Sequence, residues 1–156
     1  MKLAVLVDNL GANQLAYNVI KNFNGLVEVR PEIDCIAFYE NSVRPCFPTM
    51  FPIMQIYEAY GYDGVVVGTK LSNVGALLNF PMCTRKYFYV WDLEWIRFKS
   101  KYYNSLVSVY RNPNVKLIAR SEEHKKIIEN CWNVKVEGIV DDFNVNELIE
   151  VINGRD

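Results

Sequence analysis

The sequence predicts a doubly wound α/β domain: a Rossmann-like three-layer sandwich with a mostly parallel sheet of about six strands, spanning residues 1–156 as a single domain. Short apolar runs rich in Val, Ile and Leu do not alternate with polar residues, as is typical of strands covered on both faces. Most of these runs are followed by a polar cluster and then by a helical pattern. Such an alternation of strand and helix favours parallel strands joined by right-handed crossovers.

Each of the clearest expected strands ends abruptly at a polar cluster. These junctions are LAVLV before residues 8–14, GVVVG before 69–73, YFYV before 91–95, KLIA before 120–124 and VEGIV before 141–144. In open α/β sheets, ligands bind outside the carboxyl ends of the strands. Function is therefore expected at these five clusters.

The N-terminal half is expected to begin with a strand at 3–7 and a helix at 13–23, whose apolar residues fall on one face. Asn24-Gly25 is expected to end that helix, because glycine suits the left-handed position after a helix. Three prolines within 41–52 exclude a central strand there. The other elements expected in this half are strand 34–39, a helix at 53–60, strand 65–67 and a short helix at 72–79 capped by Ser72.

The C-terminal half carries clear helix-start signals. Ser121 is a favourable N-cap, and acidic residues follow it in the first turn, where the helix dipole favours negative charge. Asn144 with Glu147 three residues later is typical of a capping box. The elements expected in this half are strand 86–91, a helix at 102–111, strand 115–119, a helix from Ser121, strand 134–140 and a helix at 145–153.

Composition limits the expected partners. The chain is 51% apolar and 22% charged, with a net charge of -1, so no global field attracts nucleic acid or anionic lipid. Neither nucleic acid nor a membrane is therefore expected as a partner, and the three cations within 97–101 are interpreted as a solvated helix face. No stretch approaches the roughly 18 apolar residues of a spanning helix, and the first residues lack a signal-peptide pattern. A cytoplasmic location is expected.

The four cysteines predict neither a disulfide framework nor a metal site. Cys35, Cys46, Cys83 and Cys131 form no C-x-x-C pair, and His124 is the only histidine. All four are expected to be reduced thiols, with Cys35 and Cys131 in the core. No metal and no cofactor are expected.

The loop D-N-L-G-A-N at residues 8–13 lacks both glycine-rich phosphate fingerprints. Gly11 either lets the backbone approach a ligand or simply turns the chain. Asp8 resembles the acidic residue of flavodoxin-like phosphoacceptor proteins. Such a receiver also needs a lysine at a later strand end, and Lys70, one residue beyond Thr69, matches this poorly.

The segment Trp91-Asp92-Leu93-Glu94-Trp95 combines two indoles with two carboxylates. An indole can stack on a sugar or base ring, and a carboxylate can bind hydroxyls or act as a general base. The alternative is that both tryptophans fill the core and the acids face solvent. Arg120-Ser121, where a strand meets a helix start, is either an anion site or a helix cap beside a surface arginine.

Three motifs together resemble the N-terminal, acceptor-side domain of GT-B type glycosyltransferases. They are the strand and loop VLVDNLGANQ, the strand-to-helix segment KLIARSEEHKKII, and VEGIVDDF, which resembles a Val-Asp near that family's interdomain hinge. YFYVWDLEW is also similar to small glycosyltransferase-like proteins of bacteriophages. The donor-site motif of the family's second domain, a pair of acids after a glycine-rich turn, has no counterpart in this sequence.

The resemblance implies the acceptor-side half of a split sugar-transfer enzyme, which would pair with a separate donor-domain chain and bind a nucleotide sugar or glycan. Asp92 would be the general base, Trp91 or Trp95 would stack on a ring, and Arg120 with Ser121 would hold a phosphate. The substrate-binding residues expected on this hypothesis are Asp8, Asn9, Gly11, Asn13, Thr69, Trp91, Glu94, Trp95, Arg120 and Ser121.

Two other functions stay open at this point. The first is a non-catalytic binding module for a nucleotide, glycan or protein, which would form a homodimer through aromatic residues of Phe47–Phe51 and Tyr102–Tyr110. The second is a phosphoacceptor of the receiver type, acting at Asp8.

Overall fold

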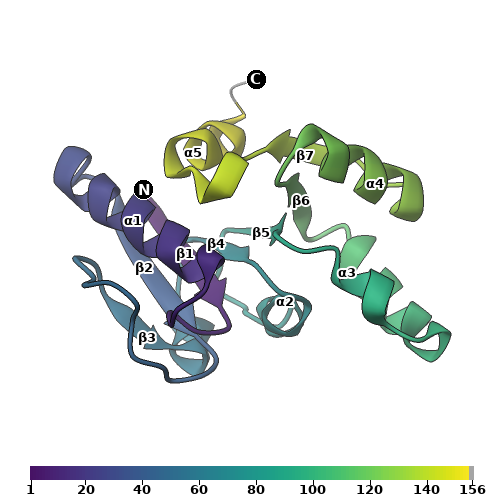
Figure 1. Ribbon diagram of the computed structural model, residues 1–156, viewed down its shortest axis with the longest axis horizontal. Coiled ribbons are helices and arrows are strands. Elements are labelled where there is room, and N and C mark those ends of the chain that lie inside the picture. The colour runs from purple at the N-terminus through teal and green to yellow at the C-terminus, as the bar shows by residue number, and fades with distance from the viewer. Residues whose placement is uncertain (155–156) are drawn as a thin grey trace.

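The computed structural model describes residues 1–154 and has a single sheet of seven strands, all parallel (Figure 1). The strand order is β3-β2-β1-β4-β5-β6-β7. The α/β fold class predicted from the sequence is confirmed. The strands are β1 Lys2–Val7, β2 Asp34–Tyr39, β3 Ile53–Gln55, β4 Val65–Gly68, β5 Arg85–Val90, β6 Lys116–Ala119 and β7 Val136–Ile139.

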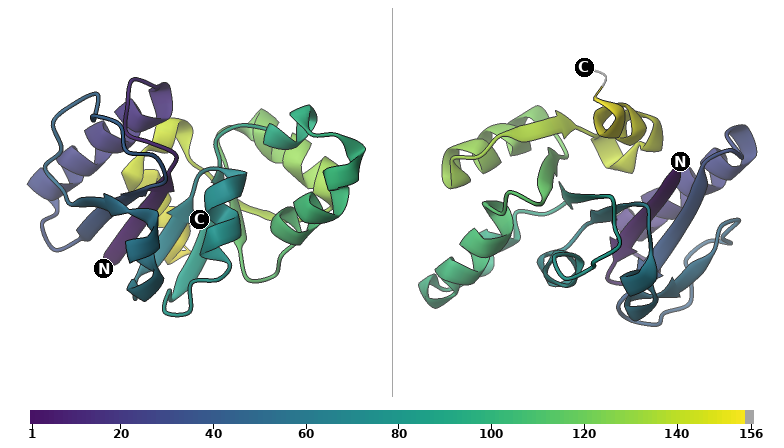
Figure 2. Two further views of the ribbon diagram at one scale, coloured as in Figure 1. Left: turned by 90° about the horizontal axis from the view of Figure 1, so that it is seen from below. Right: turned by 180° about the vertical axis from the view of Figure 1, so that it is seen from behind.

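Helices cover both faces of the sheet, which makes three layers. They are α1 Gln14–Val29, α2 Leu71–Leu77, α3 Tyr103–Tyr110, α4 Glu122–Trp132 and α5 Val145–Asn153, with 3-10 turns η1 Ile56–Gly61, η2 Glu94–Arg97, η3 Ser100–Tyr102 and η4 Asp141–Phe143. Helices α1 and α5 pack on one face, and α2, α3 and α4 on the other. In the left view of Figure 2, the teal helix α2 lies in front of the strands and the yellow α5 behind them.

The strand order reverses direction at β1. Strands β2 and β3 are added in turn on one side of β1. Strand β4 then lies on the other side of β1, and β5, β6 and β7 follow outward from it. The loops that leave β1 and β4 therefore diverge toward opposite faces, α1 on one and α2 on the other. This divergence opens a crevice at the carboxyl ends of the two strands, where open α/β sheets bind ligands.

Two of the helices expected in the N-terminal half differ in the structure. The expected helix at 53–60 is a three-residue edge strand followed by the 3-10 turn η1. Helix α1 does not end at Asn24-Gly25 but runs through to Val29, because Leu26 is buried in the same core as Phe23. Asn24 instead binds the neighbouring loop, accepting from the Met50 backbone N–H at 2.7 Å.

The segment after β5 also differs from the prediction. Residues 94–97 and 100–102 form the two 3-10 turns η2 and η3, with Lys99 between them, so the three cations within 97–101 do not share one helix face. Ser72 does not cap α2, which begins at Leu71.

Cys35 is buried as expected, whereas Cys131 is exposed on α4. No helix of residues 1–154 is long and apolar enough to cross a membrane.

Candidate functional site

A cleft of about 320 Å³ lies at the carboxyl ends of β1, β4 and β5. Its residues come from three of the five junctions that the sequence marks. The β1 loop and the start of α1 contribute Asp8, Asn9, Asn13 and Leu15, the end of β4 contributes Thr69 and Lys70, and the segment after β5 contributes Trp91, Asp92, Glu94 and Arg97. The cleft occupies the position that the reversal of strand order creates.

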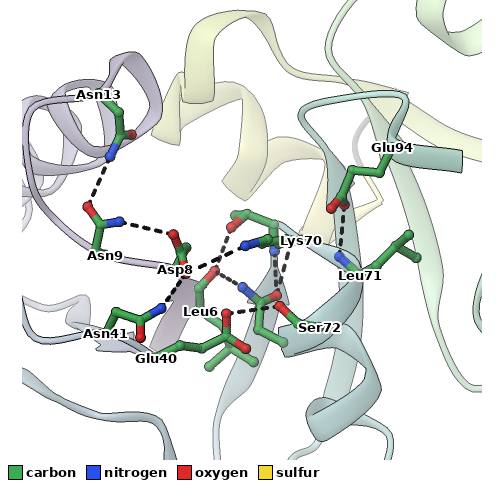
Figure 3. A network of polar contacts seen from close by, with 12 residues as sticks. Leu6, Asp8, Asn9, Asn13, Glu40, Asn41, Lys70, Leu71, Ser72 and Glu94 are labelled. Atoms are coloured by element: carbon green, nitrogen blue, oxygen red, sulfur yellow. Dashed lines mark hydrogen bonds and ion pairs between the residues drawn. The ribbon is translucent and has the colours of Figure 1, made fainter. Parts of the chain in front are cut away.

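Asp8 is held in place by three neighbours (Figure 3). Its Oδ1 accepts from the Asn41 side chain at 2.7 Å and lies 3.6 Å from the Lys70 ammonium. Its Oδ2 accepts from the Asn9 side chain at 3.0 Å. Asp8 thus joins the β1 loop, the loop after β2 and the end of β4, and it balances the charge of Lys70.

The β1 loop is shaped by its own amides. Asn9 Oδ1 accepts from the Gly11 backbone N–H at 2.9 Å and from the Asn13 side chain at 3.2 Å. Asn13 Oδ1 in turn caps α1 by accepting from Ala16 N–H at 2.9 Å. A Cβ on Gly11 would come within 2.7 Å of Val43 Cγ1, so Gly11 lets the chain turn beneath the loop after β2 and does not line the cleft.

The β4 side of the cleft is fixed by two buried polar side chains. Thr69 Oγ1 donates to the Leu6 carbonyl at 2.7 Å, and Asn73 Nδ2 donates to the same oxygen at 3.2 Å. Asn73 Oδ1 accepts from the backbone N–H groups of Thr69 and Lys70 at 3.0 and 3.1 Å. These bonds join β1 to the start of α2 and orient Lys70 toward Asp8 (Figure 3).

The two carboxylates after β5 have different environments. Asp92 is exposed and pairs with Arg97, with 2.6 Å between Oδ2 and Nη2, and this contact raises the pKa of Arg97. Glu94 is only 8% exposed, and its Oε2 accepts from Leu71 N–H at 2.9 Å. Burial raises the pKa of Glu94, although the Leu71 hydrogen bond and the nearby Lys70 partly oppose this shift.

Only one of the two tryptophans lines the cleft. The Arg120 guanidinium lies 3.8 Å from the centre of the Trp91 ring, and its Nη2 pairs with Asp142 Oδ1 at 3.0 Å. Trp95 instead packs edge-on against Tyr110 and Trp132, with ring centres 5.0 and 5.7 Å apart. Trp91 thus belongs to the cleft and Trp95 to an aromatic cluster behind it.

The structure brings together seven of the residues that the sequence singled out: Asp8, Asn9, Asn13, Thr69, Trp91, Asp92 and Glu94. Four others do not line the cleft: Gly11, Trp95, Arg120 and Ser121. Ser121 caps α4 by accepting from His124 N–H at 3.1 Å, and Arg120 reaches the site only through Trp91.

Sequence reasoning missed two cations of the cleft, Lys70 and Arg97. Lys70 lies two residues after the end of β4, in the same junction as Thr69, but as the lysine of a receiver it matched poorly. Arg97 was grouped with the solvated cations. Within residues 1–154 no three His, Cys, Asp or Glu side chains gather as a metal site would require.

No family model, curated protein or solved structure matches this chain.

Proposed function

We propose that the cleft binds a sugar, and that the chain is the acceptor-side domain of a sugar-transfer enzyme of the GT-B type. The observation that supports this proposal best is the set of groups that face one space: carboxylates, amides, a hydroxyl, two cations and one indole. Carboxylates and amides bind the hydroxyls of a sugar, and an indole packs on its ring. A volume of about 320 Å³ is at the lower end of the range for small-molecule sites, about 300–1,000 Å³.

Trp91 is the ring-binding residue on this proposal. Arg120 covers part of the indole at 3.8 Å and is itself held by Asp142. A side chain fixed in this way loses little further entropy when a ligand packs on it, so binding is favoured. The expectation that Arg120 binds phosphate stays a prediction, and its contacts to Trp91 and Asp142 give it a second role, which is to hold the Trp91 ring from outside the cleft.

Glu94 is the proton acceptor on this proposal. A general base works best when its pKa lies near the working pH, and two carboxyls in different environments divide such roles between them. Burial raises the pKa of Glu94, whereas Asp92 is exposed and paired with Arg97. The assignment of the base to Asp92 stays a prediction, and the burial of Glu94 is the observation that supports Glu94 in this proposal.

The transfer step follows from these roles. The acceptor hydroxyl gives its proton to Glu94 as its oxygen forms a bond to the anomeric carbon of the donor. The bond from that carbon to the leaving phosphate breaks, and the phosphate takes the bonding electrons. The residues of the β1 loop contain no phosphate fingerprint, so a second domain or chain supplies the donor site in this proposal.

A thermal-shift experiment tests sugar binding directly. The purified chain is heated with simple glycans, nucleotide sugars and free nucleotides. A ligand at about 100 times its Kd adds about 2.7 kcal/mol to the free energy of unfolding, which is several degrees in Tm. We expect a rise in Tm with a glycan or nucleotide sugar, and loss of that rise in Trp91→Ala.

The matched control is Tyr57→Ala, which removes an exposed aromatic side chain on η1, outside the cleft. It should keep the ligand-induced rise in Tm. No response to any sugar would count against the proposal. A response to sugars, with no transfer in any mixture with a donor-domain chain, would support the non-catalytic binding module instead.

A second candidate function rests on the pair Asp8 and Lys70, whose charged atoms lie 3.6 Å apart. A receiver-type phosphoacceptor needs a lysine beside its acidic residue. The sequence position of Lys70 matched that lysine poorly, but its ammonium lies next to Asp8. Asp8 would attack the phosphorus of acetyl phosphate, and acetate would leave with the bonding electrons. Mass spectrometry after incubation with acetyl phosphate should then show an added phosphoryl group in the parent chain and none in Asp8→Asn.

A further inference from the structure

One stretch of the chain is strongly basic although the whole is nearly neutral. Residues 95–121 contain no Asp or Glu, whereas the full sequence has 18 acidic and 17 basic residues. Three of its six cations pair with acids outside the stretch, Arg97 with Asp92, Lys116 with Glu137 and Arg120 with Asp142. Within residues 1–154, the cations without such a partner are Lys99, Lys101 and Arg111. Such local asymmetry attracts an anionic partner even when net charge does not.

The start of this stretch also exposes large apolar side chains. We call residues 96–103 the rim segment; it contains the end of η2, all of η3 and the first residue of α3. The exposed fractions of its apolar residues are 68% for Ile96, 44% for Phe98, 43% for Tyr102 and 57% for Tyr103. Single exposed apolar residues are ordinary, but four within eight residues mark an interaction surface.

Cations alternate with these apolar side chains. Arg97 pairs with Asp92, but neither Lys99 nor Lys101 forms an ion pair with any residue of the described chain. The Lys101 ammonium lies 5.0 Å from the centre of the Tyr102 ring. Both lysines are therefore available to bind anions. They lie beside exposed apolar side chains, whose burial against a partner would also be favourable.

A groove of about 310 Å³ runs beside the rim segment, between α3 and α4. Its aromatic and aliphatic walls come from Trp95, Phe98, Tyr103, Leu106 and Trp132, and Lys99 also lines it. An apolar channel with a lysine among its walls fits a molecule that has an acyl chain and an anionic headgroup.

We propose that the rim segment binds the surface of a lipid bilayer that contains anionic lipids. Ile96 is the most exposed apolar residue of the segment, and it has no ring on which a nucleic-acid base could stack. An aliphatic side chain gains instead from entering the boundary between headgroups and acyl chains. Lysine stems can lie along that boundary while their ammonium groups reach the lipid phosphates.

The rim segment lies next to the cleft. Turn η2 carries Glu94 and Arg97, which line the cleft, and between them Trp95 lines the groove and Ile96 points to solvent. In Figure 1, α3 and the turns before it form the end of the molecule opposite β3. Binding there leaves β3 and η1 away from the bilayer. The proposal stands whatever ligand the cleft binds.

Vesicle co-sedimentation of the full chain tests the proposal, with phosphatidylcholine vesicles made with and without phosphatidylglycerol. We expect binding to the anionic vesicles only, weakening as salt rises. The double variant Lys99→Gln with Lys101→Gln removes both free lysines. It should weaken binding about 25-fold, since each lysine near an anionic surface strengthens binding by a factor of about five. Ile96→Ser with Phe98→Ser should weaken it about tenfold or more.

The matched control is Met54→Ser with Tyr57→Ser, which removes equally exposed apolar side chains at β3 and η1. This variant should bind vesicles as the parent does, and circular dichroism should show that all variants fold. Absence of binding to anionic vesicles at low salt would overturn the proposal, as would full binding by both rim variants. Binding of a single-stranded oligonucleotide that the lysine variant loses, without vesicle binding, would overturn it in favour of nucleic acid.

Discussion

The Glu94 carboxylate accepts the backbone N–H of Leu71 at 2.9 Å, and so ties the turn after β5 to the first residue of α2. This bond joins two walls of the cleft across 23 residues of sequence. It also holds a carboxyl group that is 8% exposed in the wall of the cleft. The free energy of unfolding should therefore depend on pH through the titration of Glu94.

The first prediction concerns stability against pH. Burial raises the folded-state pKa of Glu94, so the unfolded chain releases this proton at a lower pH than the folded chain does. Between the two pKa values the unfolded state binds fewer protons, and the free energy of unfolding falls as pH rises. Glu94→Gln removes this term and keeps an acceptor for Leu71 N–H. The difference in unfolding free energy, variant minus parent, should therefore be more positive at pH 7 than at pH 4, as measured by urea unfolding.

Glu28→Gln is the control, because Glu28 is an exposed carboxyl on α1, away from the cleft. Its unfolding free energy should follow the parent at both pH values. If Glu94→Gln also followed the parent at both, the raised pKa of Glu94 would be refuted.

The second prediction concerns Asn73, whose side chain is fully buried and makes three hydrogen bonds. Asn73→Ala leaves the Leu6 carbonyl with one partner fewer and two backbone N–H groups without an acceptor. Buried groups left without partners cost about 1–3 kcal/mol each, so chemical denaturation should show a loss of at least about 2 kcal/mol. Asn79→Ala, at an exposed position after α2, should cost less than about 1 kcal/mol.

The third prediction compares two glycines. A Cβ on Gly68 would lie 2.5 Å from Val74 Cγ2, so Gly68→Ala should force α2 away from β4 and cost about 1–3 kcal/mol. A Cβ on Gly25 meets nothing within 4 Å, and Gly25 lies inside α1. Gly25→Ala should therefore stabilise the protein by about 0.5–1 kcal/mol in the same denaturation assay. Destabilisation by Gly25→Ala would instead support a helix that ends there.

The fourth prediction concerns the Arg120 guanidinium, which covers the Trp91 ring at 3.8 Å. Arg120→Ala should expose the indole, raise its quenching by acrylamide and lower stability by about 0.5–1 kcal/mol. The other two tryptophans stay packed against Tyr110, so the added quenching reports on Trp91. Lys101→Ala, which removes a cation from beside Tyr102, should leave tryptophan quenching unchanged. Unchanged quenching in Arg120→Ala would contradict the observed contact.

Most strands and two helix starts could be predicted from residues close together in the sequence. The apolar runs mark β1, β4, β5, β6 and β7, and the N-caps at Ser121 and Asn144 form as their side chains predict. These features depend on residues within a few positions of one another, where sequence spacing fixes geometry. The missed edge strand β3 has only three residues and no pattern of its own, and its pairing with β2 decides its conformation.

The composition of the cleft was decided by the tertiary structure. Five junctions looked alike in sequence, but only those after β1, β4 and β5 meet in the cleft, because strand order places β1 beside β4. The same long-range packing buries Glu94 and leaves Asp92 exposed. It also directs the Trp95 side chain to the aromatic cluster, whereas Trp91 faces the cleft. The sequence alone therefore placed the polar groups at strand ends. Burial between distant segments selected which of them share one site, since side-chain direction there depends on contacts that no local pattern encodes.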